Sequence, residues 1–198
     1  MHLIGHSAGS ILLGHLLERL GTLDAAKAGL SVQTCSLYAA ACSVRFAVER
    51  YLPAADSGLL PLQKLFLYHL SDGNEKADAL PSPKTPAYGK SLLYLVSRAL
   101  DNARKMPLLG MERALDPKYA KSFDHWAKSE LASLQQWQSR WPAAQGTTLR
   151  EPTVRTTARG DRIQATHGSF DNNLDIIGET LQRIRGQALV APLEWLDY

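Results

Sequence analysis

A serine stands in a run of small residues near the start of the chain, where the hydrophobic pattern changes. Residues 5–9 read Gly-His-Ser-Ala-Gly, and the apolar pair Leu3 and Ile4 comes directly before them. An amphipathic helix is predicted after this run by leucines on one helical face, at positions 12, 13, 16, 17 and 20. A strand that passes into a helix over so few residues needs a tight turn. The pattern therefore predicts a strand–turn–helix unit with Ser7 at the turn.

The pentapeptide fits the pattern G-x-S-x-G, which places a serine on a strained turn between a strand and a helix. Side chains two positions before and after the serine would collide in such a turn, so we expect glycine to be required at Gly5 and Gly9. The turn lifts the hydroxyl above the sheet and points the N-terminus of the next helix at developing negative charge. Ser7 is therefore a candidate nucleophile. A Gly- and Ser-rich turn that only caps a helix is the alternative.

The rest of the chain alternates between apolar runs and helical patterns. Near-continuous apolar runs and β-favouring residues predict strands over residues 32–41, 64–70 and, within the polar segment 142–161, residues 153–158. Apolar residues at helical spacing predict helices over residues 88–104, 117–141 and 173–185. This alternation is typical of an α/β layered fold. We expect a single domain over residues 1–198, with residues 88–142 forming a helical insertion before the last strand.

A serine hydroxyl becomes a good nucleophile only when a base takes its proton. His167 comes after the last predicted strand and before the last predicted helix, where a loop can present its imidazole over the sheet. His6 is next to Ser7, but their side chains diverge across the turn, so we expect His6 to pack or bond locally. His69 lies inside a predicted strand and is less suitable. His167 is the candidate base, and a loop histidine without a role is the alternative.

The base in turn needs a carboxylate that orients it and stabilises its charged form. Asp72 directly follows the predicted strand 64–70. If that strand lies two positions from the serine strand, about 10 Å separates them, and an imidazole with hydrogen bonds of about 2.8 Å bridges most of that distance. Asp72 is the expected acid. Glu75 and Asp78 are alternatives because the same loop can present them, and a structural turn role for Asp72 stays open.

The order Ser7, Asp72, His167 resembles the α/β-hydrolase superfamily, of the serine esterase and lipase-like kind, over nearly the whole chain. The resemblance implies a serine hydrolase that cleaves an ester, thioester or amide of a small molecule through an acyl-enzyme intermediate. It implies that the backbone N–H of Ala8 contributes to the oxyanion hole, and it implies no metal or organic cofactor. The insertion either covers a sheet face or forms a lid over an acyl group. An acyltransferase that uses the same serine is a more distant alternative.

The chain departs from the family at its beginning. In α/β-hydrolases the serine follows the fifth strand of eight, so this chain resembles the C-terminal half, with strands five to eight, mostly parallel, flanked by helices. The family's second oxyanion donor, from the loop after the third strand, has no counterpart here, and losing one donor typically slows acyl transfer about a hundred- to a thousandfold. The serine strand also becomes an apolar sheet edge. We expect it to self-associate or to pair with a missing N-terminal half.

The same departure supports an alternative function, a non-catalytic hydrolase fragment that acts as, or requires, a binding partner. Composition excludes other classes. The chain has 45% hydrophobic residues and a net charge of +3 without a nucleic-acid-binding motif, so we expect a globular protein that binds no nucleic acid. No apolar run is long enough for a stable membrane span, and no secretory signal is visible. Cys35 and Cys42 predict no disulfide framework, so the expected location is cytoplasmic.

Overall fold

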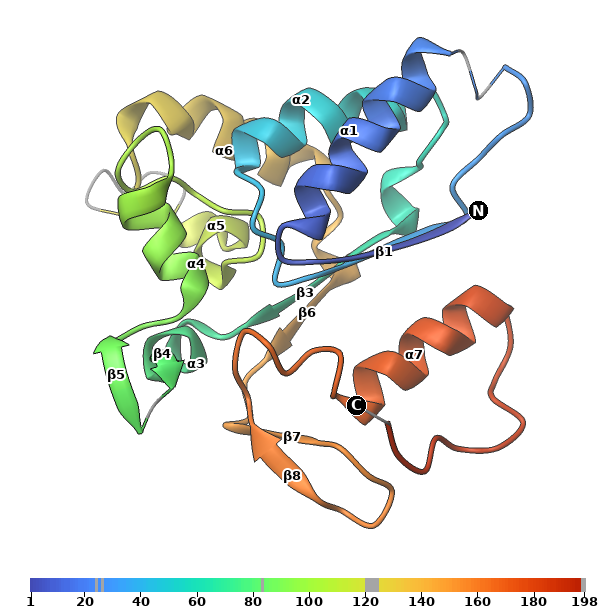
Figure 1. The fold of residues 1–198 in the computed structure, drawn as a ribbon. Coiled ribbons are helices and arrows are strands. Elements are labelled where there is room, and N and C mark those ends of the chain that lie inside the picture. The colour runs from blue at the N-terminus through green and yellow to red at the C-terminus, as the bar shows by residue number, and fades with distance from the viewer. Residues whose placement is uncertain (24, 26, 83, 120–124, 197–198) are drawn as a thin grey trace.

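The computed structural model describes residues 1–23, 25, 27–82, 84–119 and 125–196, and its centre is a four-stranded parallel sheet (Figure 1). The strands follow one another in the order β1 (His2–His6), β2 (Thr34–Tyr38), β3 (Leu65–Leu70) and β6 (Gly146–Leu149). All three pairings between them are parallel. The strand that precedes Asp72 therefore lies two positions from the strand that precedes Ser7, as the sequence argument requires.

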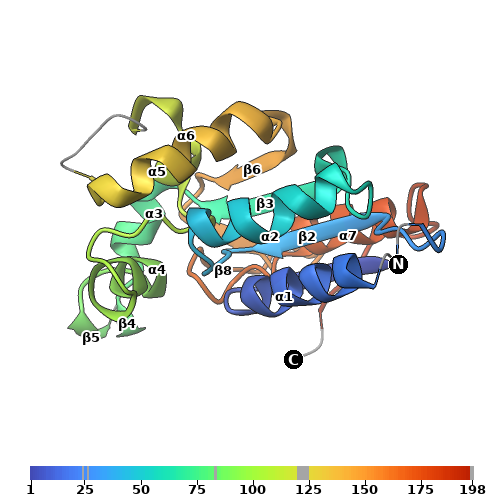
Figure 2. The ribbon, with the colours of Figure 1, turned by 90° about the horizontal axis from the view of Figure 1, so that it is seen from above.

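Helices cover both faces of this sheet, which confirms the predicted α/β class. On one face α1 (Gly9–Thr22) packs beside α2 (Val44–Asp56), and α2 packs beside α6 (Leu131–Arg140) (Figure 2). On the other face α7 (Leu174–Arg185) contacts β2 (Figure 1). Because of this double cover every residue of β2 is buried, and so is every residue of β3 except Phe66. No helix in the described ranges is long and apolar enough to cross a membrane.

Local capping explains where the helices next to the site begin. The Ser43 hydroxyl accepts a hydrogen bond from the backbone N–H of Phe46 at the start of α2. At the start of α7, Asn173 Oδ1 accepts hydrogen bonds from the N–H groups of Asp175 and Ile176. The helix ends at Gly186, which has a positive φ of 68° that favours glycine. The predicted final helix, residues 173–185, is therefore confirmed to within one residue.

The segment between β3 and β6 contains less helix than predicted. After α3 (Asp72–Ala77) come the hairpin strands β4 (Leu80–Ser82) and β5 (Thr85–Tyr88), then α4 (Leu92–Leu95), a π-helix (Val96–Leu100) and α5 (Glu112–Leu115). The predicted helix over residues 88–104 is wrong at both ends. It begins only after Ser91, whose hydroxyl accepts a hydrogen bond from the N–H of Tyr94, and it ends before Asp101.

The predicted helix over residues 117–141 is also wrong in its first half. Short 3-10 turns at Pro117–Tyr119 and Lys128–Glu130 precede α6, and residues 120–124 lie outside the described part of the chain. Between these turns the Trp126 side chain is buried, and the N–H of Ala127 donates a hydrogen bond to the carbonyl of Lys105. This contact with a distant segment holds the backbone out of a helix, so α6 begins only at Leu131.

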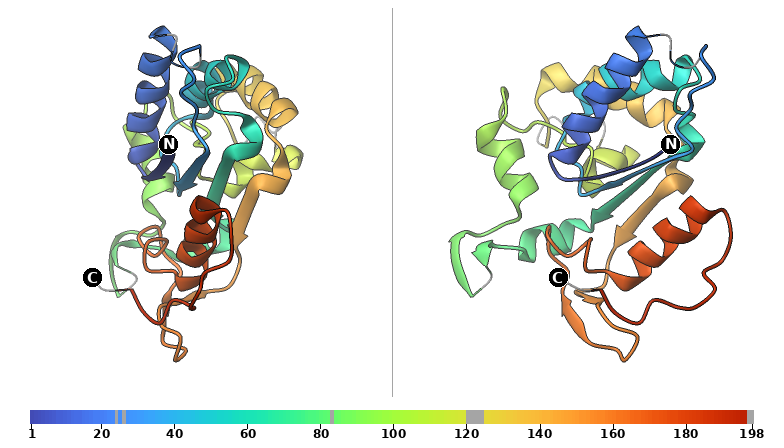
Figure 3. Two further views of the ribbon diagram at one scale, coloured as in Figure 1. Left: turned by 90° about the vertical axis from the view of Figure 1, so that its right-hand side faces the viewer. Right: turned by 45° about the vertical axis from the view of Figure 1, so that its right-hand side comes forward.

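The fourth strand of the sheet comes from the polar segment 142–161, where the sequence indicated a different strand. The predicted strand 153–158 is instead β7 (Thr153–Arg155), which pairs antiparallel with β8 (Arg162–Gln164) outside the main sheet (Figure 3). The true edge strand, β6, is half-buried along its length and so carries no apolar run. The last parallel strand of the sheet is therefore β6, whereas the predicted strand 153–158 belongs to a separate hairpin.

The strand β1 forms one edge of the sheet and pairs only with β2 in the described part of the chain. At the two ends of β1, the N–H of Ser7 donates a hydrogen bond to the carbonyl of Tyr38, and the carbonyl of Met1 accepts one from the N–H of Gln33. Because alternate residues of a strand bond to the same neighbour, the odd-numbered residues of β1 bond to the β2 segment. The peptide groups at even positions in between therefore face the open edge. Two large apolar side chains of β1 and α1 are exposed, Ile4 at 50% and Leu12 at 71%. The expected apolar edge is present.

We propose that this edge makes the isolated chain self-associate through β1 and α1. The double variant Ile4→Lys, Leu12→Lys should weaken the association at least tenfold, because each lysine replaces an apolar contact of about 1.5–3 kcal/mol. Sedimentation over a range of concentrations measures the dissociation constant. Leu100→Lys, which changes a leucine that is 66% exposed elsewhere, is the matched control and should leave the constant unchanged. A chain that stays at 21.8 kDa at all concentrations would refute this proposal.

Candidate active site

Ser7 is held on a strained turn between β1 and α1, as the motif predicts. Its φ angle is +52°, a left-handed value that costs a residue with a side chain about 1–2 kcal/mol. The turn is fixed on both sides. The N–H of Ser7 donates to the carbonyl of Tyr38, and its carbonyl accepts hydrogen bonds from the N–H of Ala41 and from the hydroxyl of Ser10. Neighbouring β2 and the first turn of α1 therefore together stabilise the conformation that presents the hydroxyl.

The two glycines of the motif have different roles. A Cβ atom built on Gly5 would lie 2.9 Å from Leu13 Cδ1 and 3.1 Å from the backbone of Gly9, so glycine is required there, as predicted. A Cβ atom built on Gly9 would meet nothing within 4 Å. The expectation that Gly9 is needed is therefore wrong, because α1 begins at this residue and its Cβ position faces open space.

This difference predicts opposite outcomes for two otherwise identical substitutions. Gly5→Ala should lower the free energy of unfolding by about 1–3 kcal/mol, since its methyl group must displace Leu13 or the backbone of α1. Gly9→Ala should be neutral or stabilise the fold by up to about 1 kcal/mol, because alanine is favoured over glycine in a helix. Urea denaturation measures both values. Equal destabilisation by the two substitutions would contradict the described geometry of the turn.

The side chain of His167 reaches Ser7 from the far end of the chain. His167 Nε2 lies 2.9 Å from Ser7 Oγ, within hydrogen-bond distance, although 160 residues separate them in sequence. His167 is only 9% exposed, whereas Ser7 is half-buried and Ala8 is exposed. The N–H of Ala8 has no hydrogen-bond acceptor among the described residues, and it lies at the start of α1. The candidate nucleophile, the candidate base and a backbone N–H that is unpaired among the described residues therefore lie together at one end of the sheet.

The surroundings of His167 keep its imidazole neutral. Burial, with a smaller contribution from the nearby His6, lowers the pKa of His167 to about 4. A neutral imidazole can accept the proton of the serine hydroxyl. The ring is therefore in the state a general base requires at every pH well above 4.

Asp78 contacts the backbone of His167. Asp78 is 5% exposed, and its Oδ2 accepts a hydrogen bond of 2.7 Å from the N–H of His167. Burial raises the pKa of this carboxyl, and the hydrogen bond from His167 partly offsets the rise. The other ring nitrogen of His167, Nδ1, is buried without a hydrogen-bond partner in the described part of the chain. Of the carboxylates described, Asp78 alone is hydrogen-bonded to His167.

The structure does not bring Asp72, the expected acid, into contact with His167. Its carboxylate accepts hydrogen bonds from Tyr94 at 2.5 Å, Lys76 at 2.6 Å and Arg113 at 2.8 Å. Although partial burial opposes it, hydrogen bonds from Lys76 and Tyr94 hold the pKa of Asp72 below its usual value. Asp72 thus joins α3, α4 and α5 through ion pairs and hydrogen bonds, a structural role different from the turn role left open by the sequence.

Glu75, the alternative acid, bonds to Ser91 and makes no hydrogen bond to His167 in the described part of the chain. It is 1% exposed, and its Oε2 accepts a hydrogen bond from the Ser91 hydroxyl at the start of α4. Burial raises the pKa of Glu75 to about 8, and the nearby charges of Asp78 and Asp72 contribute to the rise. Its second oxygen has no hydrogen-bond partner among the described residues. Glu75 therefore helps to fix the start of α4 through Ser91.

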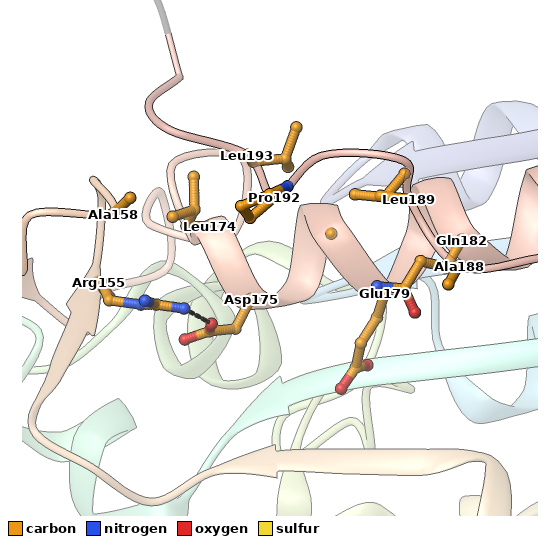
Figure 4. A pocket seen from close by; sticks show the side chains of 11 residues that line it. Arg155, Ala158, Leu174, Asp175, Glu179, Gln182, Ala188, Leu189, Pro192 and Leu193 are labelled. Carbon is orange, nitrogen blue, oxygen red and sulfur yellow. Dashed lines mark hydrogen bonds and ion pairs between the residues drawn. The ribbon is translucent and has the colours of Figure 1, made fainter.

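A separate hollow of about 510 Å³ lies between α7 and the C-terminal segment that folds back along it (Figure 4). Its walls are apolar at Leu174, Leu189 and Leu193, and an ion pair joins Arg155 and Asp175 at one end. Neither Ser7 nor His167 lines it. The hollow is therefore distinct from the candidate active site.

A scan against protein-family models and searches of the curated proteins and of the solved structures found no match to this chain. The geometry therefore carries the functional argument. It brings together Ser7 and His167 as the sequence predicts, and it adds two contacts on the backbone of His167, from Asp78 and from His6. Asp78 was an alternative from the sequence, while His6 was expected only to bond locally.

Proposed function

We propose that the chain is a serine hydrolase that cleaves an ester, thioester or amide of a small molecule through an acyl-enzyme intermediate. The observation that carries the proposal is the contact of 2.9 Å between Ser7 Oγ and His167 Nε2, made by a serine with a φ of +52°. A strained backbone that aims a hydroxyl at a buried neutral imidazole has no evident structural purpose, and such strain is common at active sites. The arrangement suits nucleophilic attack on an acyl carbon.

In the proposed reaction, each described group at the site has a role. Ser7 Oγ attacks the acyl carbon while His167 Nε2 takes its proton. The N–H of Ala8 donates a hydrogen bond to the oxyanion, and the N-terminal end of α1 adds favourable electrostatic potential. His167 then gives its proton to the leaving alcohol, thiol or amine, and the acyl group stays on Ser7. Water attacks in the second half of the reaction, with His167 again acting as base.

We infer that Asp78, rather than Asp72, is the acid partner of His167. When His167 takes a proton it becomes a buried cation, and a nearby carboxylate is needed to stabilise it. Asp78 already accepts a hydrogen bond from the backbone N–H of His167, and the Nδ1 atom of the His167 ring has no hydrogen-bond partner among the described residues. Hydrogen bonds at catalytic sites often tighten only when substrate binds. Asp72 is fully engaged by Tyr94, Lys76 and Arg113.

We also propose that the chain has part of the α/β-hydrolase fold that its sequence resembles. On that view β1, β2, β3 and β6 correspond to strands five to eight of the α/β-hydrolase sheet, and the helices between β5 and β6 correspond to the insertion. In that fold the N–H of Ala8 provides one oxyanion donor.

We also propose a cytoplasmic location for this activity. Cys35 and Cys42 are free thiols inside the same apolar core, which suits a reducing compartment. Burial raises the pKa of Cys42 to about 12, so this thiol stays protonated and unreactive.

A fluorophosphonate that reacts with activated serines tests the proposal. We expect one label per chain, located at Ser7 by peptide mass spectrometry and absent in Ser7→Ala. His167→Gln should slow labelling at least a hundredfold, because the general base is removed. The rate should fall only as the pH drops below about 5, since His167 gains a proton near its pKa of about 4.

The same assay distinguishes the two candidate acids. Asp78→Asn keeps an oxygen for the N–H of His167 but removes the charge, so labelling should slow between tenfold and about ten-thousandfold. Asp72→Asn, the matched control, should lower stability but leave the labelling rate within about twofold. If the folded chain takes no label at any concentration, the alternative of a non-catalytic hydrolase fragment is supported instead.

A further inference from the structure

The side chain of His6 contacts the backbone of His167 and has no part in the proposed proton transfers. His6 is the last residue of β1, next to Ser7, but its ring reaches across to the loop that carries the base. Its Nε2 lies 2.8 Å from the carbonyl oxygen of His167. A carbonyl oxygen can only accept a hydrogen bond, so Nε2 of His6 must carry the hydrogen. This contact excludes a His6 ring that carries hydrogen on Nδ1 alone, and Nδ1 lies 4.0 Å from Asp171 Oδ2.

The backbone of His167 is thereby held at both of its polar groups. Asp78 accepts a hydrogen bond from its N–H at 2.7 Å, and His6 donates one to its carbonyl at 2.8 Å. These two bonds limit rotation of the backbone on either side of the Cα atom that bears the imidazole. The loop around His167 contains no regular helix or strand. Its position therefore depends on such contacts with neighbouring elements.

Aromatic packing supports the same part of the loop. The His6 ring lies 5.3 Å from the His167 ring, between centroids, and meets the buried ring of Phe170 edge-on at 6.2 Å. Phe170 in turn stacks on Tyr38 of β2 with an angle of 7° between the rings. Packing thus holds the loop against the sheet, and the hydrogen bond from His6 fixes the position and direction of the His167 carbonyl.

We propose that His6 is a positioning residue for the base, and that its Nε2–H bond to the His167 carbonyl places the imidazole at hydrogen-bond distance from Ser7. The proposal rests on the proposed function. One residue of the turn carries the nucleophile and the residue before it holds the base, so the relative position of the two groups is set within a single dipeptide. A displacement of about 1 Å at such a site can cost about a hundredfold in rate.

Two substitutions separate the hydrogen bond from the packing of the ring. His6→Phe keeps a flat ring against Phe170 but removes the donor, whereas His6→Gln keeps an N–H donor without the ring. With the fluorophosphonate, His6→Phe should lower the maximal labelling rate about ten- to a hundredfold and leave the concentration for half-maximal rate within about twofold. His6→Gln should lose less. The decrease in the logarithm of its labelling rate should be at least a third smaller than the decrease in His6→Phe. Thermal melts of both variants show that they are folded.

The matched control is His15→Phe. His15 lies on α1, also meets a phenylalanine ring, that of Phe46, edge-on at 5.2 Å, and is exposed, so this variant should label at the rate of the unsubstituted chain. Equal rates for the unsubstituted chain and His6→Phe would overturn the proposal. An equal loss in His6→Phe and His6→Gln would also overturn it, because ring shape rather than the donated bond would then matter.

A second measurement needs no substitution. In the imidazole nitrogen NMR spectrum of the unsubstituted chain, His6 should carry its proton on Nε2, and this proton should exchange slowly with water. A proton on Nδ1 alone would overturn the proposal whatever the labelling rates are. If the unsubstituted chain takes no label while His6 shows the expected tautomer, the proposed function fails and the structural contact stands.

Discussion

The hydrogen bond between Ser7 and His167 depends on the parallel sheet that joins the two ends of the chain. In a parallel sheet every strand ends at the same edge, so segments that follow β1, β3 and β6 can meet there even when they are far apart in sequence. The α1 helix and the segment after β2 stabilise the strained backbone of Ser7 on one side of this contact. On the other side, the loop of His167 is held by Asp78, His6 and the buried ring of Phe170.

The three carboxyl groups near the site, those of Asp72, Glu75 and Asp78, differ in their surroundings and therefore suit different roles. Asp72 is surrounded by donors, and the hydrogen bonds from Lys76 and Tyr94 keep its pKa low, so it is an ionised member of a structural cluster. Glu75 is buried, and its pKa of about 8 makes it largely neutral at pH 7, as suits a group that caps a helix through Ser91. Asp78 is buried and accepts a hydrogen bond from the backbone N–H of His167. Only this third environment suits the stabilisation of a buried imidazolium.

The sequence predicted that Ser7 and His167 lie together, but it favoured Asp72 over Asp78 as the carboxylate beside His167, for a physical reason. Ser7 is specified locally, because Gly5, the apolar strand and the leucine-rich helix all lie within a few residues of it. His167 follows from the order of elements in an α/β fold. The choice between Asp72 and Asp78 depends on the conformation of the α3 segment, which contacts from Tyr94 and Arg113 help to fix. Such distant contacts leave no local pattern. The edge strand β6 was missed for a related reason, since a half-buried strand needs no apolar run.

The proposed function requires that Ser7 becomes covalently acylated during the reaction. Intact-mass spectrometry of the chain, quenched with acid during the turnover of an activated short-chain ester, detects this intermediate. We expect one acyl group per chain, attached to Ser7 and absent when Ser7 is replaced by alanine. A folded chain that never gains the mass of an acyl group, or that gains it on another residue, would refute the proposed function.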